Sequence, residues 1–257
     1  MEKETPHMNE AFNIDCMEYM RSLPDKAFDL AVVDPPYGIN ITGRHRSQSC
    51  HVEREREKRV PLVGGNGRPF GGKGQTIRGR LHKPCESAFY HAFDDSSPPD
   101  AEYFRELMRV SKAQIIWGGN FFLDFLTKAS CMIIWDKGRR GMDQADCEIA
   151  WTNLRGQSRI FDFKWNGMLQ QDMKNKEDRI HPTQKPVQLY AWLYRNFARE
   201  GDKILDTHLG SGSSRIAAWD AGLDFAGCEI DKVYFDLQEK RFEAHAAQGN
   251  LFLMDEH

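Results

Sequence analysis

The sequence predicts an α/β fold built on a mainly parallel sheet. First, short apolar runs rich in Val and Ile recur along the chain, as expected of strands buried on both faces. Second, segments with helical periodicity or loop composition separate several of these runs. Third, a glycine-rich turn joins a late run to the next helical segment. At 257 residues, the chain has room for one large domain of this kind.

The apolar runs give the order of the predicted strands. The first of them ends at two consecutive prolines, which stop a strand because they cannot donate to its hydrogen-bond ladder. We predict strands over residues 28–33, 113–117, 131–135, 147–151, 203–205 and 225–230.

Two intervals between these runs carry a helical pattern. One precedes the second predicted strand, and the other follows Pro186, a residue type that favours the first turn of a helix. We interpret the aromatic side chains on their apolar faces as core. The apolar positions are Phe104, Leu107 and Met108 in the first helix, and Tyr190, Leu193, Tyr194 and Phe197 in the second.

Residues 41–92 break this alternation and are interpreted as an insertion. The stretch is rich in Gly and His, and from Arg44 to Lys83 it has eleven Lys or Arg against three Glu. Such an excess favours contact with nucleic-acid phosphates, and the alternative is a solvated loop without a specific partner. The candidate phosphate-contacting residues are Arg44, Arg46, Arg68, Lys73, Arg78, Arg80 and Lys83.

Composition limits the partners and the cellular compartment that we expect for the protein. The net charge is −3, so nucleic-acid binding would rest on a local patch. Six cysteines without a Cys-x-x-Cys pair, and an N-terminus without a secretory segment, favour a cytoplasmic protein. No run approaches the roughly 20 apolar residues of a membrane helix. Cys50, His51, His82 and Cys85 could bind zinc, but their spacing follows no common finger pattern, and we predict no metal.

Asp34, Pro35, Pro36 and Tyr37 follow the first predicted strand and form the strongest candidate site. Parallel sheets bind ligands at the carboxyl ends of their strands. The prolines fix the backbone, so that its carbonyl oxygens and the Asp34 carboxylate form a rigid set of acceptors. Such acceptors can hold the exocyclic amino group of a nucleobase, a poor nucleophile, while Tyr37 offers a face for stacking. The alternative is an ordinary turn at a strand end.

A second candidate site lies near the C-terminus. Asp206 ends a short predicted strand, and Gly210 and Gly212 follow it in a turn that lets the backbone approach a ligand. Arg215 replaces the third glycine of a dinucleotide motif, which counts against a nicotinamide-dependent oxidoreductase. Glu229, in the last predicted strand, can accept hydrogen bonds from both ribose hydroxyls of an adenosine. The alternative is a glycine turn followed by a surface acid.

His181-Pro-Thr-Gln-Lys-Pro186 precedes this turn and completes a recognisable set of motifs. With it, the chain resembles S-adenosylmethionine-dependent DNA adenine-N6 methyltransferases of the β arrangement, whose catalytic motif precedes the cofactor motif. Residues 13–20, 117–122, 135–137 and 150–153 also match, so the resemblance covers nearly everything outside the insertion. It implies one catalytic domain over residues 1–257 with a Rossmann-like methyltransferase fold. This fold has a mainly parallel seven-stranded sheet, helices on both faces and a circularly permuted motif order.

The resemblance also implies roles for single residues. Asp34, Pro35 and Pro36 would hold the target amino group, and Tyr37 would stack on the extruded base. Phe163 and Trp165 stand where the family often has a second base-contacting segment, although core packing explains them equally well. The residues implied to bind S-adenosylmethionine are Asp15 and Cys16 near its adenine, Glu229 at its ribose, Asp206, Gly210 and Gly212 along its ribose and methionine, and Thr183 and Lys185 at its carboxylate.

One departure from the family pattern concerns the cofactor turn, where Thr207 and His208 replace Pro and Phe. We interpret His208 as a neutral substitute for an aromatic contact. The departure favours one alternative, a catalytically silent DNA-binding protein that keeps the cofactor fold. Adenine is implied as the target because relatives that modify cytosine N4 commonly have Ser in place of Asp34. The implied partner is double-stranded DNA, in a bacterium or phage, with a homodimer possible and any restriction enzyme unknown.

Overall fold

The structure is a computed structural model that describes residues 7–39, 95–140, 145–166 and 169–254. These residues belong to one compact unit, Met1–Asn40 together with Tyr90–His257. The other unit, Ile41–Phe89, lies outside the described residues, so the predicted insertion stays a prediction.

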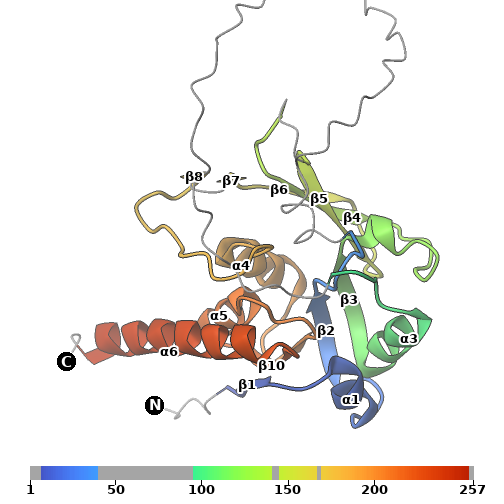
Figure 1. Ribbon diagram of the computed structural model, residues 1–257, viewed down its shortest axis with the longest axis horizontal. Coiled ribbons are helices and arrows are strands. Elements are labelled where there is room, and N and C mark those ends of the chain that lie inside the picture. Colours follow the sequence, from blue (N-terminus) through green and yellow to red (C-terminus); the bar gives the residue numbers. More distant parts are fainter. Residues whose placement is uncertain (1–6, 40–94, 141–144, 167–168, 255–257) are drawn as a thin grey trace, which may run out of the picture. The chain divides into compact units, whose positions relative to one another are not determined.

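An eight-stranded sheet runs through the described unit in the order β1-β10-β9-β2-β3-β5-β4-β6 (Figure 1). A separate antiparallel pair is formed by β7 (Trp165–Asn166) and β8 (Leu169–Gln170). The strands of the large sheet are β1 (Asn9–Phe12), β2 (Phe28–Val33), β3 (Ser111–Trp117), β4 (Met132–Asp136), β5 (Cys147–Thr152), β6 (Arg159–Asp162), β9 (Lys203–Asp206) and β10 (Asp224–Cys228).

The sheet is mainly parallel, as predicted, and only β5 runs against its neighbours β3 and β4. All six predicted strands form, although the last ends at Cys228, before the predicted end of residues 225–230. The seven-stranded prediction is one strand short. The sequence did not predict the edge strands β1 and β6, because both are short and lack a continuous apolar run.

Strand order places the two candidate sites side by side. From β2 the chain continues to β3 on one side, whereas β9, the other neighbour of β2, continues to β10 on the opposite side. Such a reversal creates a crevice at the carboxyl ends of the strands. Asp34 follows β2 and Asp206 ends β9, so both residues stand at this reversal.

Helices cover both faces of the sheet, which confirms the predicted layers (Figure 1). Leu30 and Val32 face a core shared with α4 (Val187–Phe197) and α5 (Ser213–Asp220). Ala31 and Val33 point to the other face, where α1 (Cys16–Arg21) and α3 (Ala101–Val110) pack. This alternation follows from the two-residue period of a strand. The chain ends with α6 (Lys232–Met254), and no described helix is long and apolar enough to span a bilayer.

Candidate active site

The carboxyl end of β2 carries a set of hydrogen-bond acceptors around Asp34. Oδ1 of Asp34 accepts a hydrogen bond from the Tyr37 hydroxyl at 2.6 Å, and Oδ2 accepts one from Nζ of Lys185. Within the described part of the chain, no donor engages the carbonyl oxygens of Pro35 or Pro36. Because each carboxylate oxygen has two lone pairs, Asp34 keeps further acceptor capacity.

Tyr37 is held by the segment that follows β3. Its ring stacks on Phe121, with ring centroids 5.0 Å apart and planes 17° apart, and meets Phe122 edge-on at 6.0 Å. Gly118 has a φ of +70°, and a Cβ there would lie 2.2 Å from Cε1 of Tyr37. Only glycine fits this close approach, so Gly118 fixes the position of the tyrosine ring.

Lys185 precedes α4, is 4% exposed and lies between two carboxylates. Its Nζ donates to Asp34, lies 3.1 Å from Oε2 of Glu148 and donates to the Tyr37 hydroxyl at 3.4 Å. Glu148 of β5 is also paired, through Oε1, with Lys137 after β4. Two cations and two carboxylates therefore compensate one another in a largely buried cluster.

The protonation states in this cluster follow from its charges. Burial alone would lower the pKa of Lys185, but Asp34 and Glu148 outweigh it and raise that pKa. Burial would raise the pKa of Glu148, whereas Lys185 and Lys137 lower it to about 2. Burial, and then the charge of Asp34, hold the pKa of Tyr37 well above 10. At neutral pH the tyrosine therefore stays a hydrogen-bond donor beside an ionised Glu148 and a charged Lys185.

This environment bears on the role predicted for Lys185. Its Nζ donates to Asp34 and to Tyr37 and forms an ion pair with Glu148, whose Oε2 accepts no hydrogen bond from the described residues. Contact with the methionine carboxylate of the cofactor stays a prediction, and that carboxylate would compete with Asp34 and Glu148 for the charge of Lys185.

Asp206, the aspartate of the cofactor turn, is 2% exposed at the end of β9. Its carboxylate accepts hydrogen bonds from the Ser214 hydroxyl and, at 3.0 Å, from the backbone N–H of His208. Burial raises the pKa of Asp206 to about 7 although both hydrogen bonds oppose it. The turn continues through Gly210 and Gly212, whose φ angles of +52° and +73° lie in the left-handed region.

Thr207 and His208, which depart from the family pattern, form a hydrogen-bonded chain. Oγ1 of Thr207 lies 2.7 Å from the hydroxyl of Tyr103 in α3 and 2.9 Å from Nδ1 of His208. The rings of Tyr103 and His208 meet edge-on at 5.5 Å. Burial lowers the pKa of His208 to about 4, so its ring is neutral near pH 7. Polar contacts thus replace the proline and phenylalanine of the family.

Glu229 follows β10 and braces the same turn. Its Oε2 accepts a hydrogen bond from the N–H of Gly210 at 2.8 Å, and its Oε1 accepts one from the N–H of Asp231 at 2.9 Å. Asn13 donates to the carbonyl of Glu229 at 2.8 Å, which ties the end of β1 to the end of β10. Burial raises the pKa of Glu229.

Asp15 and Cys16 lie at the start of α1, close enough to Glu229 for its charge to act on the thiol. Asp15 caps the helix by accepting a hydrogen bond from the N–H of Met17 at 2.7 Å. Burial, followed by the charges of Asp15 and Glu229, raises the pKa of Cys16 to about 12, so it is a neutral thiol. The structure therefore brings together three of the residues predicted around the adenosine.

The segment from His181 to Lys185 lies against the glycine-rich turn. A Cβ on Gly210 would meet the His181 ring at 3.8 Å. Nδ1 of His181 lies 3.0 Å from Oγ1 of Thr183, and its ring meets Tyr234 of α6 edge-on at 4.3 Å. Thr183 is thus placed beside the turn, and Lys185 lies with Asp34.

Arg241 of α6 supports the turn from another side, a role that the sequence did not reveal. Its guanidinium donates to the carbonyl of Ser211 at 2.7 Å and to Oγ of Ser213 at 2.9 Å, and it pairs with Glu177 at 2.7 Å. Glu177 also accepts a hydrogen bond from the N–H of Val187 at 3.0 Å, at the start of α4. An Arg on a long helix gives no sequence signal of such partners.

Other predicted site residues lie elsewhere. Phe163 and Trp165 are 9% and 3% exposed within the core cluster, and Nε1 of Trp165 donates to the carbonyl of Gln184 at 3.0 Å. Their contact with a base stays a prediction, and their burial agrees with the alternative, core packing. The seven basic residues predicted to contact phosphates and the four possible zinc ligands all fall outside the described residues.

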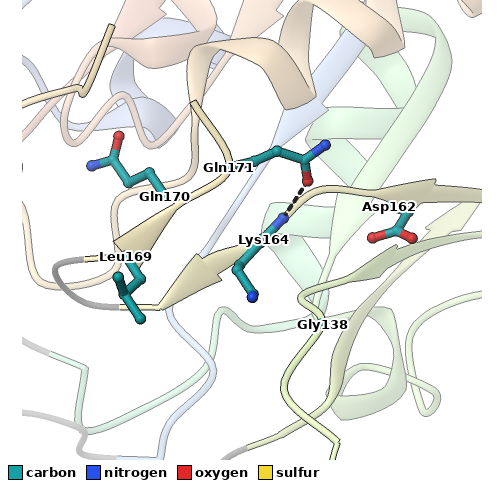
Figure 2. Close-up of a pocket in the computed structure, with 6 residues that line it drawn as sticks. All are labelled: Gly138, Asp162, Lys164, Leu169, Gln170 and Gln171. Carbon is teal, nitrogen blue, oxygen red and sulfur yellow. Dashed lines mark hydrogen bonds between the residues drawn. The ribbon is translucent and has the colours of Figure 1, made fainter. Parts of the chain in front are cut away.

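An open pocket of about 580 Å³ lies beyond the ends of β4 and β6 (Figure 2). Gln171 turns toward Lys164 and accepts a hydrogen bond from its backbone N–H. None of the residues that surround Asp34 or the glycine-rich turn lines this pocket, so we assign it no role in the candidate site. Its lining residues are Gly138, Asp162, Lys164, Leu169, Gln170 and Gln171.

Comparisons with known proteins agree with this geometry. A DNA methylase family model of the N6/N4 type matches residues 116–240. The Type II methyltransferase M2.DpnII of Streptococcus pneumoniae is 23% identical over 241 residues, which cover 90% of this chain and 88% of that protein. M.BglII of Bacillus subtilis is 22% identical over 275 residues, with 96% and 72% covered. The structure of TTHA0409 from Thermus thermophilus has a TM-score of 0.52 at 16% identity, covering 93% and 95%.

The chain is thus an S-adenosylmethionine-dependent methyltransferase. Residues 116–240 match the DNA methylase model, so the enzyme class is that of the DNA methyltransferases, as the motifs suggested. Its own residues fit the cofactor. Each oxygen of Glu229 accepts one backbone hydrogen bond and keeps acceptor capacity for a hydroxyl, as a ribose requires.

Proposed function

We propose that this protein transfers a methyl group to the N6 amino group of adenine at specific sites in double-stranded DNA. The observation that carries the proposal is the acceptor cluster of Asp34, Pro35 and Pro36 at the sheet reversal, one strand away from the turn after Asp206. An amino group that is both donor and nucleophile requires acceptors on one side and an electrophile on the other.

The cofactor supplies an electrophilic methyl group bound to a sulfonium. We infer that Asp206, Gly210 and Gly212 line its methionine and ribose, with Glu229 at the ribose hydroxyls, Asp15 and Cys16 beside its adenine, and Thr183 and Lys185 at its carboxylate. Glu229 is suited to this role because the N–H groups of Gly210 and Asp231 already orient its carboxylate. The polar chain through Thr207 and His208 would keep the turn rigid without a proline.

The target adenine must leave the duplex to reach this crevice, at a cost of roughly a few kcal/mol. Tyr37, braced by Gly118 and Phe121, would stack on the extruded base. Asp34 and the proline carbonyls would accept the two hydrogens of the amino group, leaving its nitrogen lone pair directed at the methyl carbon. Asp34 would also stabilise the positive charge that develops on the amino nitrogen during methyl transfer, and one amino proton would be released afterwards.

Cytosine N4 is the second candidate, since the family match includes enzymes of both types. The acceptor cluster would serve either base, and only Asp34 at the head of the motif favours adenine. Two further features belong to the proposal: a cytoplasmic location and a bacterial or phage restriction-modification setting, with a second copy of the chain as a possible partner. Recognition of a DNA sequence would fall to the basic residues of the insertion.

Replacement of Asp34 tests the proposal. We expect Asp34→Ala to lose on the order of 100-fold or more in methyl-transfer rate, as removal of a positioned polar stabiliser does. The assay follows labelled methyl incorporation into unmethylated genomic DNA, and modification-sensitive sequencing of the product reports the base and the site. Asp29→Asn is the control, because Asp29 lies on β2 itself, close to Asp34 in the chain, but pairs with Lys112. Binding of cofactor and DNA without incorporation in the wild type would instead favour the silent protein.

A further inference from the structure

Glu148 is the one member of the buried charge cluster that no motif assigned. Four segments contribute to this cluster: the turn after β2 with Asp34, the segment before α4 with Lys185, β5 with Glu148 and the turn after β4 with Lys137. The side chains of Lys185 and Lys137 are 4% and 12% exposed, and that of Glu148 is 24% exposed. Such burial costs free energy that only close pairing offsets.

Lys185 stands between two competing carboxylates. It donates to Oδ2 of Asp34 and lies 3.1 Å from Oε2 of Glu148. If Glu148 lost its charge, Asp34 would become the only anionic partner of Lys185 among the described residues. A buried ammonium moves toward the negative charge that remains, so Lys185 would then neutralise Asp34 more completely.

The catalytic role of Asp34 requires that its negative charge is not fully neutralised by Lys185. Its carboxylate must accept hydrogen bonds from an amino group and then stabilise positive charge on nitrogen. A lysine that is fully engaged with Asp34 weakens both effects, because it occupies an oxygen and adds a positive charge beside the reacting centre. A lysine shared with Glu148 leaves more of the Asp34 charge for the substrate.

We propose that Glu148 is a positioning residue for methyl transfer, acting through Lys185. Glu148 draws Lys185 partly away from Asp34, so that Asp34 keeps acceptor strength for the amino group while Lys185 still fixes its orientation. Lys137 holds the other oxygen of Glu148 and thereby orients the carboxylate. This inference rests on the proposed function, because it assumes that Asp34 holds the amino group.

Glu148→Gln tests the inference, since glutamine keeps the shape of the side chain and removes its charge. We expect the single-turnover rate at saturating cofactor and DNA to fall about tenfold or more, while the Kd values for S-adenosylmethionine and DNA stay within about twofold. A residue that merely supports the fold would lower the melting temperature without this split between rate and binding. The matched control is Glu239→Gln, because Glu239 pairs with the buried Arg215 at 2.7 Å, away from Asp34.

Glu148→Gln leaves Lys137 buried beside a neutral partner and could fail to fold. The double variant Glu148→Gln/Lys137→Gln restores the charge balance. We expect it to regain thermal stability but not the transfer rate, since Lys185 would still have Asp34 as its only anionic partner. A wild-type rate in either folded variant would overturn the inference, and so would recovery of rate together with stability. Absence of methyl transfer by the wild type would instead overturn the proposed function.

Discussion

His208→Phe tests how burial sets the protonation of the cofactor turn. Burial lowers the pKa of His208 to about 4, and the ordinary pKa of a histidine is about 6.5. Between these two values the unfolded chain binds a proton that the folded protein does not bind. His208 therefore favours unfolding as the pH falls through this window. Phenylalanine cannot titrate, so the variant does not lose folding stability in this way as the pH falls.

The magnitude follows from the two pKa values. Lowering the pH from about 7.5 to about 5 should cost the wild type about 2 kcal/mol through His208 alone. Asp206, whose pKa is raised to about 7, acts in the opposite direction, because its folded form releases a proton only as the pH rises. Asp206 is present in both proteins, as is His181, so their contributions largely cancel in the comparison.

Urea unfolding at both pH values measures the effect. We expect the stability of His208→Phe relative to the wild type to rise by about 2 kcal/mol between about pH 7.5 and about pH 5. The variant also loses the hydrogen bond to Thr207, but this lowers its stability equally at both pH values and so does not affect the change between them. The exposed His7→Phe is the control for loss of a histidine as such. If the two stability curves ran parallel, a buried neutral His208 would be refuted.

Two further predictions concern the supports of the site. Gly118→Ala should destabilise the protein by about 3 kcal/mol and slow methyl transfer, because its Cβ would collide with Tyr37. Gly201→Ala is the control for the backbone cost alone, because Gly201 has a φ of +79° and nothing within 4 Å of its Cβ position. A folded Gly118→Ala variant with an unchanged methyl-transfer rate would contradict the role assigned to Tyr37. Arg241→Gln should cost roughly 3–5 kcal/mol and weaken cofactor binding, since it leaves Glu177 buried and unpaired. Calorimetry of the double variant Arg241→Gln/Glu177→Gln tests the cause of this loss, because removing the unpaired carboxylate should recover part of the stability. If the single variant Arg241→Gln kept the cofactor Kd of the wild type, Arg241 would not support the cofactor turn.

The sequence predicted the layers and the strand before Asp34 because these depend on local patterns. The run before Asp34 is apolar at every position from Leu30 to Val33, and only a strand covered on both faces buries all four. The sequence did not predict the edge strand β6, because this strand is mostly exposed and therefore has no apolar run. Phe163 and Trp165 were ambiguous for a related reason, because aromatic residues serve cores and nucleobases equally well in a sequence.

By itself, the sequence determined the residue types of the site: an acid and two prolines after one strand, and an acid and glycines after another. Only the tertiary structure decided which charged residues pair. Lys185 lies 151 positions from Asp34 in the chain, yet it shares its charge between Asp34 and Glu148. The physical reason is that charge pairing in a buried cluster depends on distances across strands β2, β4 and β5, and a local pattern in the sequence carries no information about those distances.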